Sequence, residues 1–198
     1  MNNSLNDIKE LKEYAEVNNI PIMQDEGIDF LTTFIIKKQI KNVLEIGTAI
    51  GYSAIMMALT KEDIHITTIE RDETRYMEAL KNIKKFNLEE KITLIFNDAL
   101  NVKLEGDFDL IFIDAAKGKN QDFFEHFESN LSMNGYIITD NMDFHGYVSM
   151  NEDEIPSKNI LGLVRKIKDY TYFLENHMLY KTTIYKVGDG VAVTERRG

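Results

Sequence analysis

The stretch NVLEIGTAIGYSAIMMA, at residues 42–58, decides the fold of this chain. An apolar run reaches the acid Glu45, two glycines follow at Gly47 and Gly51, and a segment rich in alanine, isoleucine and methionine begins after them. This order is typical of a buried strand that turns into a helix around a ligand, because glycine lets the backbone approach a bound molecule closely. A tight turn between two packed elements is the alternative interpretation.

The same alternation of strand and helix extends on both sides of this stretch. Apolar runs predict strands at residues 42–47, 64–70, 91–98, 108–116 and 135–141. Helical spacing predicts helices at residues 5–17, 25–38, 52–60, 73–87, 119–131 and 159–175. Two alternating segments flank Gly188-Asp189-Gly190 and predict a hairpin. The sequence therefore predicts an α/β fold: a Rossmann-like, doubly wound and mostly parallel sheet with a C-terminal antiparallel hairpin, and helices on both faces.

The totals of the chain restrict its class. A length of 198 residues favours a single domain over residues 1–198. We expect no membrane segment, because no stretch approaches the roughly 18–20 apolar residues of a span, and no signal peptide, because the N-terminus is polar. The absence of cysteine excludes disulfides and thiolate metal sites, and it fits a cytoplasmic location. The net charge of −10 disfavours a broad nucleic-acid surface but allows a local basic patch.

Each of the five predicted parallel strands ends in an acid. These acids are Glu45, Glu70, Asp98, Asp114 and Asp140. A single acid after a strand is ordinary, since aspartate often opens a turn or caps a helix. Five at one edge of a sheet repel one another, so we expect a cation or a set of hydrogen-bond donors to offset them. In doubly wound sheets, ligands bind beyond this edge.

The glycine pattern restricts the class of ligand that this turn can bind. A dinucleotide fingerprint needs G-x-G-x-x-G, whereas this chain has Gly47 and Gly51 without a third glycine. The looser turn suits a ligand that lacks a pyrophosphate and carries a cationic amino group, and S-adenosylmethionine fits both conditions. We expect Glu70 to accept from two ribose hydroxyls and Asp98 to accept from the adenine amino group.

Three segments give the chain a family resemblance. VLEIGTAIGYSAI, FDLIFIDAAKGKNQDFFE and GYIITDNMDFHG resemble the cation-dependent O-methyltransferases, the catechol and caffeoyl-CoA group. Within that group, DEGIDFL, NILGLVRKIKDYTYFL and VGDGVAVT are most similar to the bacterial tRNA 5-hydroxyuridine methyltransferases. The resemblance covers nearly the whole chain and implies one S-adenosylmethionine-dependent methyltransferase domain that forms a homodimer.

The resemblance also implies roles for individual residues. The positions implied to hold S-adenosylmethionine are Met23, Glu45, Gly47, Ser53, Glu70, Asp98, Ala99 and Asp114. Asp114, Asp140 and Asn141 are implied to hold Mg²⁺ or Mn²⁺, and Lys117 is implied to be catalytic together with Asp114. His145 stands where close relatives tend to have lysine.

The implied chemistry is consistent with these residue types. Asp114, Asp140 and Asn141 offer only oxygen, which suits hard divalent ions. Lys117 could accept a proton from the acceptor hydroxyl or stabilise the developing oxyanion, and the sequence leaves both roles open.

The sequence leaves three possible functions for this chain. The first is methylation of 5-hydroxyuridine in a tRNA anticodon loop to 5-methoxyuridine, since its O5 and O4 are adjacent and can chelate an ion. The first alternative is a small catechol or caffeoyl-type acceptor, and the second is a nucleotide-binding regulatory module without catalysis. The intact Asp114, Lys117, Asp140 and Asn141 argue against the regulatory module.

Overall fold

The structure is a computed structural model, and it describes residues 2–198. Its helices are α1 (Asn2–Val17), α2 (Asp25–Lys38), α3 (Tyr52–Ala58), α4 (Glu73–Lys85), α5 (Asn120–Phe127) and α6 (Lys158–Glu175). Its strands are β1 (Asn42–Ile46), β2 (His65–Glu70), β3 (Ile92–Phe96), β4 (Phe108–Ile113), β5 (Leu131–Thr139), β6 (Tyr180–Tyr185) and β7 (Val191–Arg196). Short 3₁₀ turns lie between them, including η1 (Ala99–Asn101), η2 (Lys117–Lys119) and η3 (Glu128–Asn130).

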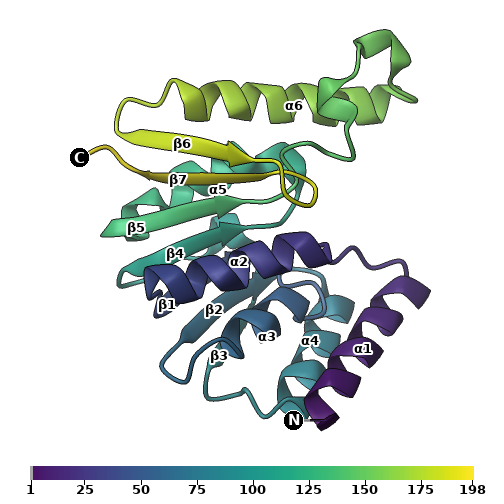
Figure 1. Cartoon of the computed structure of the whole chain (residues 1–198), viewed down its shortest axis with the longest axis vertical. Helices are drawn as coiled ribbons and strands as arrows, with labels where there is room; N and C mark the ends of the chain where they lie inside the picture. The colour runs from purple at the N-terminus through teal and green to yellow at the C-terminus, as the bar shows by residue number, and fades with distance from the viewer. Residues whose placement is uncertain (1) are drawn as a thin grey trace.

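The seven strands form one sheet in the order β3-β2-β1-β4-β5-β7-β6. Strands β1 to β5 pair in parallel, whereas β7 runs antiparallel to both β5 and β6 (Figure 1). The chain leaves the sheet centre in one direction through β2 and β3 and in the other through β4 and β5. The point where this direction reverses lies between β1 and β4, where open α/β sheets bind ligands. The predicted fold class, including the C-terminal hairpin, is confirmed.

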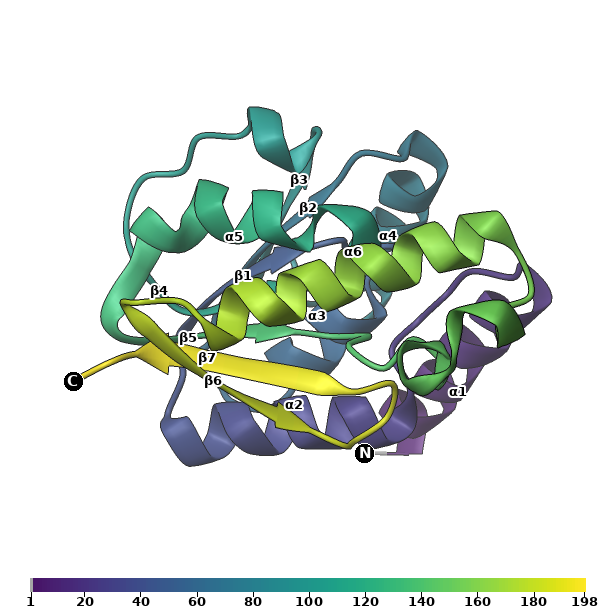
Figure 2. The same cartoon turned by 90° about the horizontal axis from the view of Figure 1, so that it is seen from above.

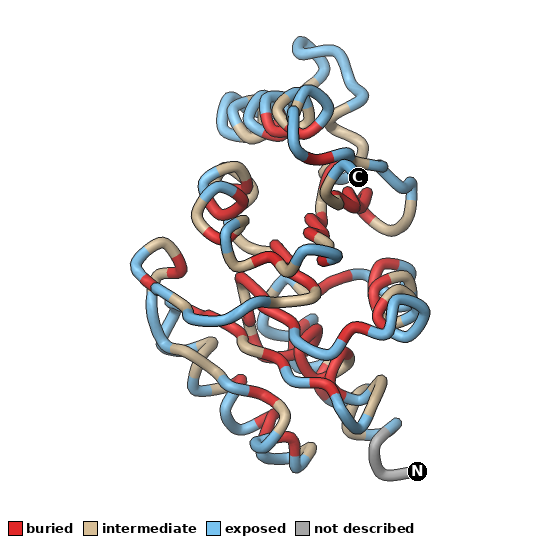
Figure 3. The backbone as a smooth tube through the Cα atoms, turned by 90° about the vertical axis from the view of Figure 1, so that its left-hand side faces the viewer, coloured by how far each residue is buried: buried red, intermediate tan, exposed pale blue. Residues whose placement is uncertain are grey.

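Alternating side chains of the strands pack against two separate layers of helices. On β4, Leu110 and Phe112 join a core with apolar residues of α1 to α4, whereas Ile111 and Ile113 join a core with α5 and α6. Figure 2 shows α5 and α6 on one side of the strands and α2 on the other. In Figure 3 the buried positions concentrate on the strands and on the inward sides of the helices. The sheet is therefore buried between helices on both of its faces.

Local sequence signals explain where several helices begin. Asp72 accepts a hydrogen bond from the Arg75 amide and caps α4. A side-chain cap of the same kind begins α6, where the Ser157 hydroxyl accepts from the Ile160 amide. Gly51 precedes α3 with a φ of 87°, a conformation that glycine adopts without strain.

The predicted helix 119–131 is wrong in its last four residues. The helix α5 ends at Phe127, η3 follows, and β5 already begins at Leu131 rather than at residue 135. The Asn130 side chain donates to the carbonyl oxygens of Leu104 and Gly106, both at 3.1 Å, and ties this turn to the segment before β4. A contact between residues this far apart in sequence overrides the local helical pattern.

Candidate functional site

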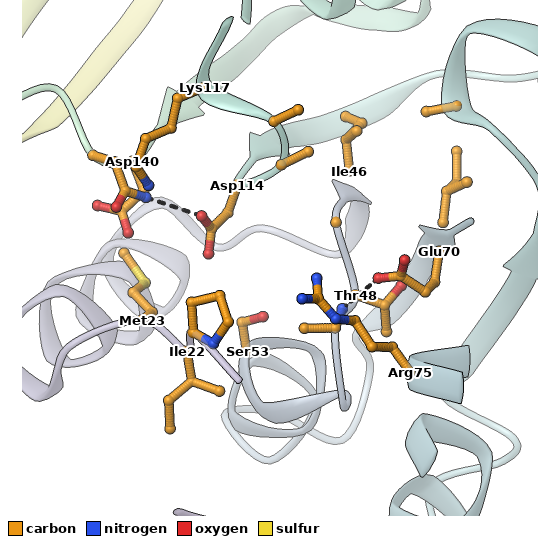
Figure 4. A pocket seen from close by; sticks show the side chains of 18 of the residues that line it. Ile22, Met23, Ile46, Thr48, Ser53, Glu70, Arg75, Asp114, Lys117 and Asp140 are labelled. Carbon is orange, nitrogen blue, oxygen red and sulfur yellow. Dashed lines mark hydrogen bonds between the residues drawn. The ribbon is translucent and has the colours of Figure 1, made fainter. Parts of the chain in front are cut away.

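A cavity of about 340 Å³ opens at the carboxyl edge of the sheet. Figure 4 shows Asp114, Lys117 and Asp140 together at one end, Glu70 and Arg75 at the other end, and Ser53 between them. The predicted residues that line this cavity are Met23, Gly47, Ser53, Glu70, Asp98, Ala99, Asp114, Lys117, Asp140 and Asn141. The fold therefore brings all of the predicted site residues except Glu45 to the wall of one cavity.

The turns after β1 and β4 approach each other closely in the cavity wall. Gly47 has a φ of 103°, and a Cβ atom added to it would lie 2.2 Å from the carbonyl oxygen of Asp114. The Asp114 amide also donates to the Ile46 carbonyl at 3.0 Å, which fixes the two strand ends side by side. Only glycine fits at position 47, because both the backbone conformation and the space exclude a side chain.

Glu70 is held rigidly at the other end. One of its carboxylate oxygens accepts from the amides of Arg71 and Asp72, at 2.9 and 2.8 Å, and the other accepts from the Ala49 amide at 2.8 Å. The second oxygen therefore keeps acceptor capacity beside the glycine turn. The residue is 7% exposed and lines the cavity, as expected of a group that accepts from ligand hydroxyls.

Asp98 lies beside Glu70, two residues after β3 ends. Its carboxylate accepts from the Leu100 amide at 3.1 Å and caps η1, and its other oxygen lies 3.2 Å from a guanidinium nitrogen of Arg71. The Leu100 amide, and to a smaller extent Arg71, hold the pKa of Asp98 below its ordinary value. Asp98 is therefore a fixed acceptor at the cavity wall, and Ala99 follows it there.

Glu45 lies beneath the cavity rather than on its wall. It is fully buried within β1, so the prediction that it ends the strand is wrong: Ile46 ends the strand. Its two carboxyl oxygens accept from the hydroxyls of Ser53 and Thr68, each at 2.5 Å. Burial raises the pKa of Glu45 to about 7, although these two hydrogen bonds oppose the shift. Glu45 therefore contacts the cavity wall only indirectly, through its hydrogen bond with Ser53.

The acidic end of the cavity contains Asp114 and Asp140, which directly follow β4 and β5. Burial raises the pKa of Asp114 above its ordinary value. Burial, and next the nearby Asp114 carboxylate, raise the pKa of Asp140 to about 7. Asn141 has a φ of 65°, and its amide nitrogen donates to Asp114 at 3.0 Å. Lys117 on η2 is the cation closest in sequence, and its charge partly offsets both shifts.

This donor set fits a hard divalent ion. Asp140 is buried and Asp114 is half-buried, so the two carboxylates repel each other, and a divalent cation between them would favour the ionised form of both. The set contains two acids and one amide, all with oxygen donors, which is the chemistry that Mg²⁺ and Mn²⁺ prefer. Within residues 2–198, no group of three or more histidine, cysteine or acidic side chains is arranged to hold a metal; the predicted set has two acids and takes its third oxygen from the amide of Asn141.

The hairpin turn adds a residue that the sequence analysis did not identify. Asp189 stands between Gly188 and Gly190 in the turn and lines the cavity, although it is only 6% exposed. One of its carboxylate oxygens accepts from the His145 amide, and the other is buried without a hydrogen-bond partner. The Gly188-Asp189-Gly190 pattern indicated a turn, but no local signal showed that this turn packs against residues 141–146.

Comparison with known proteins identifies the family. A family model described as O-methyltransferase matches residues 2–197. This chain belongs to the O-methyltransferase family. It is 31% identical over 204 residues to a caffeoyl-CoA O-methyltransferase of Populus kitakamiensis, with 96% of this chain and 86% of that protein covered.

Solved structures of the family have the same fold. The crystal structure of a Staphylococcus aureus protein, named "putative caffeoyl-CoA O-methyltransferase", has a TM-score of 0.90 and 39% identity, with 96% of this chain and 92% of that one covered. The Bacillus cereus O-methyltransferase in complex with SAH has a TM-score of 0.82 at 24% identity, with 97% and 91% covered, and this likeness concerns the fold alone.

The comparisons give different support to the sequence predictions. The resemblance to the caffeoyl-CoA group is confirmed, whereas the relatives named above give no support to the narrower tRNA resemblance. The predicted residue roles, the ion and the homodimer stay predictions. Within the described part of the chain, no helix has the length and apolar character needed to cross a membrane.

Proposed function

We propose that this O-methyltransferase transfers a methyl group from S-adenosylmethionine to one of two adjacent oxygens of a small aromatic acceptor, with Mg²⁺ or Mn²⁺ at Asp114, Asp140 and Asn141. The observation that carries the proposal is one cavity with two chemically distinct ends. Glu70 and Asp98 offer fixed acceptors at one end, and the buried Asp140 and half-buried Asp114 lie beside Lys117 at the other.

The nucleoside of the methyl donor fits the end near Glu70. The carboxylate of Glu70 is oriented by three amides and can accept from the ribose hydroxyls, while Asp98 can accept from the adenine amino group. The Ser53 hydroxyl donates its proton to Glu45, so its oxygen is free to accept from the ammonium group of the methionine part. Met23 lines the cavity beside the methionine part in this arrangement.

The acceptor and the ion belong to the acidic end. When bound there, a divalent ion lowers the pKa of an acceptor hydroxyl and thereby makes a better nucleophile at neutral pH. Asp114, Asp140 and Asn141 would hold the ion, and Lys117 lies beside them to receive the hydroxyl proton or to stabilise negative charge on the acceptor oxygen. The protein's main contribution is positioning, which can supply roughly 7–11 kcal/mol of a barrier.

A small acceptor agrees with the relatives and with the charge of the chain. The Populus kitakamiensis relative is named as a caffeoyl-CoA O-methyltransferase, and the net charge of −10 disfavours a large polyanion. The tRNA hypothesis remains a second candidate because of one local observation. Lys117 and Lys119 both lie on η2, and Lys117 lines the cavity. The Lys166 ammonium lies so close to Gly118 that a Cβ atom added there would be 3.2 Å from it.

The deciding experiment compares acceptors under identical conditions. The purified protein is incubated with isotopically labelled S-adenosylmethionine, Mg²⁺ and either catechol, resorcinol or tRNA that carries 5-hydroxyuridine. We expect methylation of catechol and none of resorcinol, because the two oxygens of resorcinol are too far apart to share one ion. Chelation should abolish turnover. Efficient methylation of the tRNA with catechol untouched would establish the second candidate, and donor binding without turnover on any acceptor would contradict enzymatic activity.

A further inference from the structure

Three consecutive residues beside the acidic end have left-handed backbone conformations. The φ angles of Phe144, His145 and Gly146 are 47°, 57° and 82°. A bulky residue such as phenylalanine is an outlier in this region, and such a conformation persists only where surrounding contacts hold it. Gly146 accepts the conformation freely, but Phe144 and His145 do not, so other contacts must hold them.

The turn of the β6–β7 hairpin supplies those contacts. The Asp189 carboxylate accepts from the His145 amide. The backbone carbonyls of Asp189 and Gly190 accept from the amides of Asp143 and Met142, at 2.8 and 2.9 Å. A Cβ atom added to Gly190 would lie 2.8 Å from the Asp143 nitrogen, so the two backbones are in direct contact. The hairpin turn therefore holds the segment after Asn141 at Met142, Asp143 and His145.

The held segment places two aromatic side chains at the reacting end. The Lys117 ammonium lies 5.6 Å from the centre of the Phe144 ring, within the range of a cation–π contact. The rings of Phe144 and His145 are 5.7 Å apart, and His145 itself lines the cavity. A change in the backbone at residues 144–146 would therefore move the side chain that covers Lys117 and the side chain that faces the acceptor.

The second carboxylate oxygen of Asp189 has no partner in this arrangement. It is buried, and the nearest ring nitrogen of His145 lies 3.7 Å away, beyond hydrogen-bond distance. A buried acceptor without a donor is costly, so a small rotation of the His145 ring that brings its N–H to this oxygen is favourable. The other ring nitrogen of His145 would then be fixed toward the cavity.

We propose that Asp189 is a positioning residue for the acceptor: it holds residues 144–146 in the left-handed conformation and orients His145, so that Phe144 covers Lys117 and His145 faces the bound acceptor. The proposal rests on the proposed function, since it assigns the acceptor to this end of the cavity. Asp189 acts through His145 and Phe144 and has no part in binding the methyl donor.

The kinetic test uses Asp189→Ala and Asp189→Asn with Glu26→Gln as the matched control. Glu26 accepts from the Gly188 amide at 3.4 Å, so the control alters the same turn from its exposed side. We expect Asp189→Ala to raise the acceptor KM about tenfold, while the Kd for S-adenosylmethionine stays within about twofold. Asp189→Asn keeps an oxygen for the His145 amide and should recover part of the loss. The control should match the wild type.

Two results would overturn the proposal. One is an unchanged acceptor KM in Asp189→Ala. The other is an equal loss of donor and acceptor affinity, which indicates general damage to the fold. If Asp189→Ala does not fold, Asp189→Asn decides alone, because its lost charge should still raise the acceptor KM through misorientation of His145.

A second measurement does not depend on activity. Amide hydrogen exchange should be slow for residues 143–146 in the wild type and in Glu26→Gln, and about tenfold or more faster in Asp189→Ala, because the His145 amide loses its acceptor. Unchanged exchange in Asp189→Ala would refute the proposal that Asp189 holds residues 144–146. If the wild type methylates no acceptor, the proposed function fails. The exchange result still tests separately whether Asp189 holds residues 144–146.

Discussion

Ser53 donates its hydroxyl to the buried carboxyl of Glu45 across 2.5 Å, and this contact joins the cavity wall to the core. Burial, and not this hydrogen bond, raises the pKa of Glu45; the hydrogen bond opposes the shift. Glu45 is fully buried within the sheet, and this burial raises its pKa to about 7 from an ordinary value of 4.5. The folded state therefore binds the Glu45 proton more tightly than the unfolded chain does.

We predict that Glu45→Gln stabilises the protein at alkaline pH. The proton bound by Glu45 favours the folded state below about pH 4.5, and this advantage is lost as the pH rises to about 7, because the buried carboxyl must then ionise. The full loss corresponds to about 3 kcal/mol of unfolding free energy. Denaturant unfolding at pH 5 and pH 8 should show the variant gaining on the wild type at pH 8. The raised pKa of Asp140 also lowers the unfolding free energy as the pH rises, and it does so in the wild type and in Glu45→Gln alike.

The exposed Glu62 provides a control for this measurement. Glu62→Gln should follow the wild type at both pH values. If Glu45→Gln shows the same change in stability between pH 5 and pH 8 as the wild type, Glu45 does not titrate as its burial implies.

A second prediction concerns Gly47. Gly47→Ala should lower the unfolding free energy by several kcal/mol, because the new Cβ atom would lie 2.2 Å from the Asp114 carbonyl in a backbone conformation that strains alanine. Gly162→Ala is the opposite case: the site is inside α6 with nothing within 4 Å, so alanine should stabilise by about 0.5–1 kcal/mol. Thermal unfolding of both variants checks the pair, and equal effects would contradict it.

Much of the fold follows from sequence patterns because its strands are short, apolar and separated by amphipathic helices. The bounds of β5 did not follow, since Asn130 bonds to Leu104 and Gly106 and ends the helix early. No local pattern contains that contact. The strand alternation of β1 could have shown that Glu45 shares a face with Val43 and points toward α3, yet the acid was interpreted as the strand end.

The candidate site also contains residues that the sequence predicts and residues that it does not. Asp114 and Asp140 follow β4 and β5 directly, so the sheet order alone brings them together. Asp189 was recognised only as a turn residue, because its function depends on packing against His145, 44 positions earlier. Residues at strand ends are predictable from topology, whereas contacts between two loops depend on the full three-dimensional structure.

A third prediction tests the donor end. Glu70→Ala should weaken S-adenosylmethionine binding by about tenfold or more, because the ribose hydroxyls lose their acceptor and the amides of Ala49, Arg71 and Asp72 lose theirs. Glu70→Gln keeps an oxygen in place and should lose less. Isothermal titration calorimetry measures both, and an unchanged affinity in Glu70→Ala would remove Glu70 from the donor site.

The last prediction concerns the ion. Asp140→Asn should lower kcat by about a hundredfold or more, because one of two charged ligands is lost, while the Kd for S-adenosylmethionine stays close to the wild-type value. The affinity of the wild type for Mg²⁺ or Mn²⁺ should rise as the pH increases through about 7, since the ion binds the ionised form of Asp140, whose pKa is raised by burial. Direct titration of the metal at several pH values measures this dependence without turnover. Full activity after exhaustive chelation would contradict the need for an ion, and Lys117 would then have to activate the acceptor alone.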